Sequence, residues 1–274
     1  MRYLPSPAET QRLTPDQVRA GFLVENLFVP GSITLQLVDL DRVIVGSAVP
    51  LADPLTLEAP DDLLADYFCE RRELGVLNIG ASGSVTVDGV DIPVQPHEVL
   101  YIGRGSREVR FASRDASAPA RFYLVSYPAH AVHPLRLMTV ADADVLELGA
   151  PESANRRRVR RYIHKGGASS CQLVMGVTTL EEGSVWNTMP AHTHDRRTEV
   201  YLYFQLPPDA MVVHLMGEPS STRSMIVRNG EVALSPGWSI HAGCGTRAYA
   251  FCWAMGGENQ DYADMQPVGM ETIR

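Results

Sequence analysis

Short runs of alternating apolar and polar residues, separated by turn residues, cover most of this 274-residue chain. Residues 83–89, GSVTVDG, alternate valine with small polar residues and end in Asp-Gly, a strong signal for a two-residue hairpin turn. Related patterns fill residues 199–206, 210–216, 224–234 and 247–256, and Asn229-Gly230 predicts a second hairpin turn. Many short strands at regular spacing predict a β-sandwich or β-barrel.

Helical signals are few. Residues 14–23, TPDQVRAGFL, offer Thr14 as the N-cap and Pro15 at the first helical position, which predicts the start of a helix. Residues 61–74, DDLLADYFCERREL, have room for one short helical turn. We therefore expect a mainly β protein with few short helices.

Two pairs of segments repeat in the same order along the chain. Residues 70–79 resemble residues 195–204, and residues 96–111 resemble residues 236–251. The matched positions of the second pair are Pro96, Gly103, Gly105 and Phe111 with Pro236, Gly243, Gly245 and Phe251. This pattern predicts a β-rich unit used twice, over residues 1–135 and 136–274, although chance similarity between β segments is the alternative.

Composition and charge restrict the classes of partner. Hydrophobic residues make up 45% of the chain and charged residues 20%, as in ordinary soluble globular proteins. A formal net charge of −8 gives no overall attraction to nucleic acid or to an anionic membrane, so an anionic ligand would need a local cluster of basic side chains. The basic run at residues 155–161 has no aromatic stacking platform around it, which also argues against nucleic-acid binding.

The sequence also bears on location. Residues 1–22 lack the apolar region of a signal peptide, and no stretch approaches 18 uninterrupted apolar residues. The four cysteines form no C-x-x-C pair, which favours reduced thiols. We therefore expect a cytoplasmic protein without a membrane partner.

Four residues have the types and spacing of a metal site. His192 and His194 are two apart, so on a strand their side chains project from the same face. Glu199 has the wrong parity for an unbroken strand, but a turn within residues 195–198 corrects it. With His241, three imidazoles and a carboxylate can hold Zn²⁺ or a similar divalent ion. The alternative is that His-Thr-His is a polar pair on the surface.

The repeat provides an internal comparison for these four residues. In the first copy their positions fall on Tyr67, Cys69, Leu74 and Tyr101. None of these is a histidine or a carboxylate, so the repeated scaffold does not require ligand-type residues there. We expect metal binding in the C-terminal copy and an N-terminal copy that lacks ligands.

These residues resemble the motifs of a bicupin, which has two tandem double-stranded β-helix (jelly-roll) barrels. The first cupin motif corresponds to Gly183, His192-Thr-His194 and Glu199, and the second to Gly230, Pro236 and His241. The sequence departs from the general pattern in a longer gap after Gly183. It departs again at Trp238, where the motif normally has glycine.

Longer segments resemble one family across nearly the whole chain. They include FLVENLFVPG (22–31), ERRELGVLNIG (70–80), LYIGRGSREVRFAS (100–113), ANRRRVRRYI (154–163), VWNTMPAHTHDRRTEVYLYF (185–204) and SPGWSIHAG (235–243). They are similar to the 5-dehydro-4-deoxy-D-glucuronate isomerases, also called 4-deoxy-L-threo-5-hexosulose-uronate ketol-isomerases, of pectin degradation. The resemblance implies one zinc ion per chain, held by the four residues above, and a cytoplasmic homohexamer.

The implied reaction converts 5-dehydro-4-deoxy-D-glucuronate, a small anionic keto-sugar, to 3-deoxy-D-glycero-2,5-hexodiulosonate. An aldose–ketose shift needs a base, and Glu218 and Glu258 are the candidates that we consider, each against a purely structural role. The candidates for contact with the substrate are Arg196, Arg197, Arg223 and Trp186, together with one or two of the arginines in residues 155–161. Arginines suit bidentate contact with a carboxylate, but such residues are more often solvated or structural.

Two other classes of function stay open from the residues alone. A cupin dioxygenase would hold Fe²⁺ and consume O₂, and a non-catalytic sugar-binding bicupin would bind metal without turnover. Oxygen consumption and turnover of a uronate separate the three.

Overall fold

Two compact units make up the computed structural model, which describes residues 1–258 and 260–274. The N-terminal unit comprises residues 1–2, 26–143 and 162–174, and the C-terminal unit comprises residues 3–25, 144–161 and 175–274. This division differs from a single cut after residue 135, because residues 3–25 and 162–174 each belong to the unit formed mostly by the other half of the chain.

The N-terminal unit is built from two antiparallel sheets. Their strand orders are β11-β8-β5-β10-β3-β2 and β4-β9-β6-β7. The bounds are β2 (Ile33–Leu37), β3 (Ile44–Ala48), β4 (Leu55–Thr56), β5 (Arg72–Asn78), β6 (Gly83–Val87), β7 (Val90–Val94), β8 (Val99–Ile102), β9 (Val109–Ser113), β10 (Phe122–Pro128) and β11 (Arg136–Met138), with the 3₁₀ turn η1 (Asp61–Leu63).

A single apolar cluster fills the space between these two sheets. Residues at every second position of β5, β8 and β10 supply one side, and residues of β6 and β9 supply the other. Its members include Leu74, Val76, Leu100, Ile102, Phe122, Leu124, Val85, Val87, Val109 and Phe111. The interior of the N-terminal unit is therefore an ordinary packed core.

The C-terminal unit repeats this plan with longer strands. Its sheets have the orders β1-β20-β17-β22-β14-β13-β12, β15-β21-β18-β19 and β16-β23. The bounds are β1 (Leu23–Val24), β12 (Asp144–Leu148), β13 (Arg157–Ile163), β14 (Val174–Leu180), β15 (Trp186–Asn187), β16 (His192–Thr193), β17 (Arg197–Phe204), β18 (Val212–Glu218), β19 (Ser221–Val227), β20 (Val232–Ser235), β21 (Ile240–Gly245), β22 (Ala250–Gly257) and β23 (Gln266–Pro267), with the 3₁₀ turns η2 (Pro151–Ser153) and η3 (Met270–Thr272).

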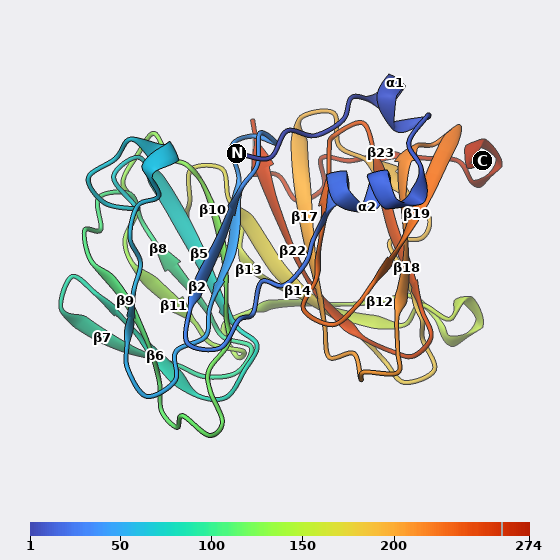
Figure 1. Ribbon diagram of the computed structural model, residues 1–274. Helices are drawn as coiled ribbons and strands as arrows, with labels where there is room; N and C mark the ends of the chain where they lie inside the picture. The colour runs from blue at the N-terminus through green and yellow to red at the C-terminus, as the bar shows by residue number, and fades with distance from the viewer. Residues whose placement is uncertain (259) are drawn as a thin grey trace. The chain divides into compact units, whose positions relative to one another are not determined.

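Two short helices accompany the C-terminal unit, α1 (Pro7–Thr10) and α2 (Pro15–Phe22), drawn in blue beside its orange and red strands (Figure 1). The predicted N-cap of α2 is confirmed: Thr14 and Gln17 form a reciprocal capping box, with Pro15 at the first position. Phe22 meets Trp238 edge to face, with 6.2 Å between ring centroids, which gives the unusual tryptophan of the second motif a packing partner. The fold is mainly β with few helices, as expected, and its sheets are open. No helix in the described ranges is long and apolar enough to cross a membrane.

One of the two predicted hairpins is confirmed. Asp88 and Gly89 both have positive φ, at 49° and 83°, and connect β6 to its partner β7. The prediction of a second hairpin at Asn229-Gly230 is wrong. A turn does form there, but β19 pairs with β18 whereas β20 pairs with β17 and β1. The turn therefore carries the chain from one sheet to the other, a crossing that local turn chemistry does not reveal.

The predicted repeat pairs equivalent strands in its first pair of segments but not in its second. β5 and β17 occupy equivalent positions: each is the third strand of the larger sheet of its unit, in the orders β11-β8-β5 and β1-β20-β17. The second pair matches β8 with β21, yet β8 neighbours β5 in the large sheet whereas β21 neighbours β18 in the small one. By strand order the counterpart of β21 is β9, so Tyr101 is not the counterpart of His241.

Candidate metal centre

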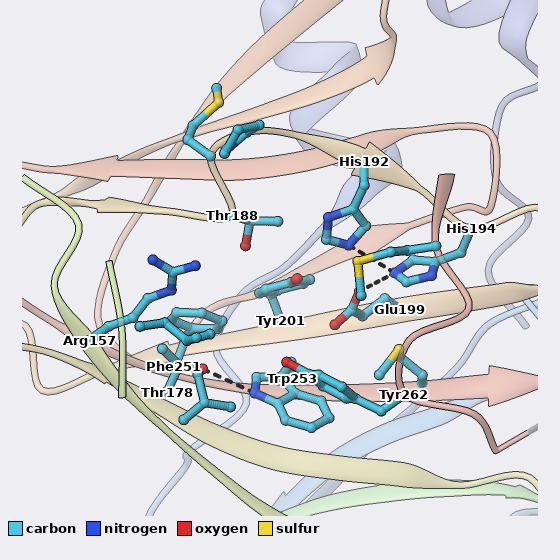
Figure 2. Close-up of a pocket in the computed structure, with 16 residues that line it drawn as sticks. Arg157, Thr178, Thr188, His192, His194, Glu199, Tyr201, Phe251, Trp253 and Tyr262 are labelled. Atoms are coloured by element: carbon cyan, nitrogen blue, oxygen red, sulfur yellow. Dashed lines mark hydrogen bonds and ion pairs between the residues drawn. The ribbon is translucent and has the colours of Figure 1, made fainter. Parts of the chain in front are cut away.

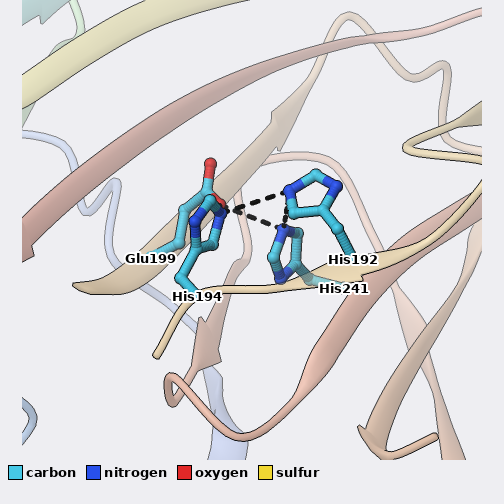
Figure 3. Close-up of side chains that lie close together, drawn as sticks. All are labelled: His192, His194, Glu199 and His241. Atoms are coloured by element: carbon cyan, nitrogen blue, oxygen red, sulfur yellow. Dashed lines mark hydrogen bonds and ion pairs between the residues drawn. The ribbon is translucent and has the colours of Figure 1, made fainter. Parts of the chain in front are cut away.

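Four side chains from three strands and one turn converge inside the C-terminal unit (Figure 3). His192 lies on β16, and His194 immediately follows that strand. The chain turns at residues 195–196, so that Glu199 on β17 comes back to the same side, as the spacing predicted. His241 enters from β21, which pairs with β18 in the smaller sheet.

The ligand-type atoms of the four side chains lie within 4.8 Å of one another. Nε2 of His192 is 3.2 Å from Nε2 of His194 and 3.0 Å from Nε2 of His241. Oε2 of Glu199 is 3.2 Å from Nε2 of His194 and 3.1 Å from Nε2 of His241. Three of the side chains are buried and His192 is half-buried.

Hydrogen bonds behind the rings fix the orientation of two imidazoles. Nδ1 of His194 is 3.0 Å from the carbonyl oxygen of Asp264 and must donate to it, because a carbonyl only accepts. Neutral His194 then presents an unprotonated Nε2 to the cluster. Nδ1 of His241 hydrogen-bonds with the hydroxyl of Ser235 at 3.2 Å. Outer hydrogen bonds of this kind are typical of histidines that bind metals.

Electrostatics favour an ionised Glu199 beside neutral His192 and His241. Burial alone would raise the pKa of Glu199, but His241 and then His194 outweigh burial and hold that pKa at about 2. Burial lowers the pKa of His192 to about 4 and that of His241 well below its ordinary value. Burial alone would lower the pKa of His194, but its hydrogen bond to Glu199 outweighs burial and raises that pKa. At neutral pH the nitrogen lone pairs of His192 and His241 therefore face the carboxylate of Glu199, an arrangement that is repulsive without a cation.

The donor set fits a divalent cation of the zinc type. Nitrogen ligands about 2.0–2.1 Å from zinc in a tetrahedral site lie about 3.3 Å apart. The contacts of 3.0–3.2 Å in the cluster are close to that value. Three histidines and a carboxylate also suit Mn²⁺, Fe²⁺, Co²⁺ or Ni²⁺.

A cavity of about 270 Å³ opens onto this cluster, and all its lining residues belong to the C-terminal unit (Figure 2). Its size suits a small metabolite, since drug-sized ligands occupy roughly 300–1,000 Å³. Besides His192, His194 and Glu199, the wall consists of Leu148, Arg157, Val159, Thr178, Thr188, Met189, Pro190, Tyr201, Phe251, Trp253, Met255, Tyr262 and Met265. The wall is largely apolar, with a few polar groups at defined places.

Arg157 on β13 is the only arginine or lysine among the residues that line the cavity. It lies on the side of Figure 2 opposite His192 and His194. Its Nη1 donates to the carbonyl of Asn155 at 2.9 Å, and no carboxylate of the described residues lies within ion-pair distance of it. Burial lowers the pKa of Arg157, although an arginine stays protonated at neutral pH. The cavity therefore contains one guanidinium that lacks a counter-charge.

The other predicted candidates for substrate contact, Arg196, Arg197, Arg223 and Trp186, lie outside this wall. Arg197 is buried and donates from Nη2 to the carbonyl of Asp264 at 2.8 Å. Arg196 is 64% exposed and lies 4.0 Å from Glu258. Arg223 donates to the carbonyls of Thr10 and Gln11, and Trp186 lies on β15.

The two predicted bases are also away from the cavity wall. Glu218, at the end of β18, accepts a hydrogen bond from Nε2 of Gln11 at 2.8 Å. Glu258 is 75% exposed and has Arg196 as its neighbour. Neither carboxylate lines the cavity next to the four converging side chains.

The sequence offered the arginines of residues 155–161 only as a group and did not single out Arg157, although a signal for it exists. In the basic run, Val159 is the one apolar residue of β13 between residues 157 and 161, so its face points to the interior. Arg157 is two positions away and shares that face, and both residues line the cavity. Tyr262 gives no such signal, because it lies in an irregular segment after β22.

Comparisons with known proteins agree on one family. The model of the KduI/IolB family matches residues 35–267. Proteins named 4-deoxy-L-threo-5-hexosulose-uronate ketol-isomerase match over 100% of this chain and 99% of their own length. They are 48% identical in Halalkalibacterium halodurans and 50% identical in Opitutus terrae.

Solved structures support the fold. An IolB-like protein from Salmonella typhimurium LT2 has a TM-score of 0.74 at 16% identity, covering 90% of this chain and 96% of its own. An oxalate decarboxylase from Lactobacillus farciminis has a TM-score of 0.59 at 11% identity, covering 89% of each chain. At these identities the likeness concerns the cupin-like fold alone.

Proposed function

The chain belongs to the KduI/IolB family, and we propose that it is a ketol-isomerase that converts 5-dehydro-4-deoxy-D-glucuronate to 3-deoxy-D-glycero-2,5-hexodiulosonate in uronate catabolism. The observation that carries this proposal is the His₃Glu cluster on a cavity with one unpaired arginine. The relatives that match the whole chain bear the name of this isomerase, so the dioxygenase and binding-protein alternatives are not favoured.

We propose that His192, His194, Glu199 and His241 hold one divalent ion, zinc by resemblance to the family. When bound, such an ion supplies Lewis acidity that stabilises the oxyanion of the enediolate by several kcal/mol. Asp264 and Ser235 would keep the rings of His194 and His241 directed at the ion.

The reaction moves one proton from C2 to C1 and another from the C2 hydroxyl to the C1 oxygen, so that no atoms are gained or lost. Among the residues of the cavity wall, the phenols of Tyr201 and Tyr262 can donate or relay a proton. Burial raises the pKa of both phenols, so they stay protonated at neutral pH. We therefore assign to one of them the transfer between oxygens, in which the phenol gives its proton to the C1 oxygen and takes the proton of the C2 hydroxyl. Replacing each tyrosine by phenylalanine tests the assignment, and Glu218→Gln and Glu258→Gln test the earlier candidates.

Arg157 is the proposed anchor for the substrate carboxylate. The carboxylate sits at the opposite end of the six-carbon chain from the reacting C1–C2 pair, and Arg157 lies across the cavity from His192 and His194 (Figure 2). A forked guanidinium matches a carboxylate geometrically, and the apolar wall formed by Phe251 and Trp253 keeps bulk water away from the pair. Charge pairing at one end thus orients the reacting carbons at the other.

We propose further that the two sheet pairs are tandem jelly-roll barrels of a bicupin, and that the protein is a cytoplasmic homohexamer. The repeated strand order and the cupin-like structural relatives support the first point, and family resemblance supports the others. Light scattering of the purified protein measures the number of subunits. A monomer in solution at micromolar concentration would contradict the hexamer.

The decisive test of the activity uses the product of unsaturated-uronate ring opening as substrate. NMR should show loss of the C1 aldehyde signal and appearance of the ketose, under anaerobic as well as aerobic conditions. Turnover that requires O₂ would instead indicate an oxygenase.

A further inference from the structure

The N-terminal unit contains a second cavity, of about 240 Å³, whose lining residues all belong to that unit. Three arginines line it, namely Arg42, Arg71 and Arg72, together with the apolar side chains of Leu37, Leu63 and Phe68. The packed core of this unit is apolar and does not require arginines. We therefore ask what the three arginines around this cavity bind.

Arg72 is the buried member of the three, with 6% of its surface exposed. Its Nε donates to the hydroxyl of Ser126 at 3.0 Å, and its Nη2 donates to the carbonyls of Arg42 and Ser126 at 2.6 and 2.8 Å. These acceptors are all uncharged. Across the described residues, Nη1 of Arg72 has no hydrogen-bond acceptor, and no carboxylate lies within ion-pair distance of the guanidinium.

A buried charge without a counter-ion is costly, and a bound anion removes that cost. Burial lowers the pKa of Arg72 to about 10, which still leaves it charged at neutral pH. Glu73 favours the charged form of Arg72, but its carboxylate forms no ion pair with the guanidinium and instead accepts hydrogen bonds from Tyr101 and from the backbone of residues 171–173. The guanidinium at the cavity wall therefore lacks a directly paired carboxylate among the described residues.

The remaining charges of the cavity are also mostly positive. Arg42 and Arg71 are exposed, and Arg71 forms a surface ion pair with Glu70 at 3.1 Å. Asp62 is the one carboxylate in the lining, and the amino group of Met1 already neutralises it at 3.1 Å. Such a concentration of positive charge is unusual in a chain with a net charge of −8.

We propose that this N-terminal cavity binds a small organic carboxylate, whose charged group meets Arg72 between Arg42 and Arg71 and whose carbon skeleton lies against Leu37, Leu63 and Phe68. A bare inorganic anion would leave the apolar wall unused. This site does not depend on the proposed isomerase activity, because it shares no lining residue with the cavity at the metal centre.

Titration calorimetry with benzoate tests the proposal, with benzamide as the neutral probe of the same shape. We use the Arg157→Met protein, which lacks the guanidinium of the other cavity. Benzoate should bind saturably to one site per chain, at least tenfold more tightly than benzamide. No saturable binding of benzoate would overturn the proposal, as would equal binding of the amide. Inorganic phosphate binding as tightly as benzoate would overturn the assignment to organic carboxylates.

Variants then locate the site. Replacing Arg42 and Arg71 together by alanine changes only exposed side chains and should weaken benzoate binding at least tenfold. Arg110→Ala is the matched control, an exposed arginine paired with Glu108 on the same unit, and it should leave binding unchanged. Arg72→Lys should weaken binding while keeping a positive charge. If the double variant and the unaltered chain bind benzoate with the same affinity, benzoate does not bind in this cavity.

Discussion

Glu199 and Arg157 are two buried or partly buried charges of the C-terminal unit that differ in their partners. Glu199 is a fully buried carboxylate that tolerates burial because imidazoles surround it, and its pKa falls to about 2 for that reason. Arg157 has no such partner among the described residues, and we assign the missing charge to the substrate. The spacing of the histidines predicts the first pattern, whereas for Arg157 the sequence offers only the weaker signal of Val159 two positions away.

Replacement of Arg157 by methionine should raise KM and reduce kcat/KM by about 10- to 100-fold, because a hydrogen bond to a charged group contributes about 1.5–3 kcal/mol. Lysine at the same position should recover part of the loss, since it restores charge without the fork. The control is Arg158→Met on the adjacent, outward position, where the arginine is 46% exposed and paired with Glu147. Equal kinetics of the two methionine variants would contradict the assignment.

His214 predicts a pH dependence of stability in the metal-free protein. It is fully buried, its Nδ1 lies 2.7 Å from the hydroxyl of Tyr203, and burial lowers its pKa to about 4. The unfolded chain has a pKa near 6.5, so it binds the proton more readily, and stability falls as pH decreases from about 6.5 to about 4. The loss is of order 3 kcal/mol, and denaturant titration of wild type and His214→Asn measures it. Parallel pH profiles would refute this role.

At the scale of elements, patterns of alternation located strands well and their partners less well. β6 and β7 follow from alternation plus Asp88-Gly89, because a two-residue turn with positive φ dictates its own pairing. Asn229-Gly230 has the same local chemistry, yet β20 leaves β19 and joins β17. The pairing of β20 with β17 depends on the burial of β20 within the larger sheet. That burial depends on the whole unit and not on the turn at residues 229–230.

Gly176 on β14 shows how one strand supports the cavity wall. A Cβ there would lie 2.2 Å from Cζ2 of Trp253 and 2.5 Å from the carbonyl of Arg160. Gly176→Ala should therefore destabilise the protein by about 1–3 kcal/mol and raise KM, since Trp253 lines the cavity. Gly46→Ala, in the N-terminal unit, is the matched control: its Cβ would lie 2.6 Å from Leu35, so it should lose stability without a change in KM. A normal KM in Gly176→Ala would contradict this role of the wall.

The segment that follows β22 supports the metal centre through one carbonyl. Asp264 accepts hydrogen bonds from both His194 and Arg197, and β23 pairs with β16 beside the ligands. Arg197→Met removes one of these bonds and should weaken metal affinity by about 10- to 100-fold. Competition with a chromophoric chelator measures the change, and Arg196→Met, at an exposed neighbour, is the control. Unaltered affinity in Arg197→Met would remove Arg197 from the support of the centre.

The whole molecule uses one β plan for two purposes. In the N-terminal unit both sheets fill the interior with apolar side chains, and Leu74 occupies the position that Glu199 holds on β17. In the C-terminal unit the interior instead holds three imidazoles, a carboxylate and a cavity. The sequence repeat predicted this asymmetry correctly for β5 and β17. It failed for β21, because Gly103 and Gly105, which follow β8, were matched with Gly243 and Gly245, which lie within β21, and this shifted the alignment by one strand.

The central claim is that the His₃Glu cluster holds the ion on which isomerisation depends. The most direct measurement follows the substrate by NMR with protein verified as metal-free, before and after addition of one equivalent of zinc per chain. We expect no turnover before the addition of zinc and full recovery afterwards. In a His192→Ala, His241→Ala double variant, zinc should restore no turnover. Undiminished turnover by the metal-free protein would contradict it.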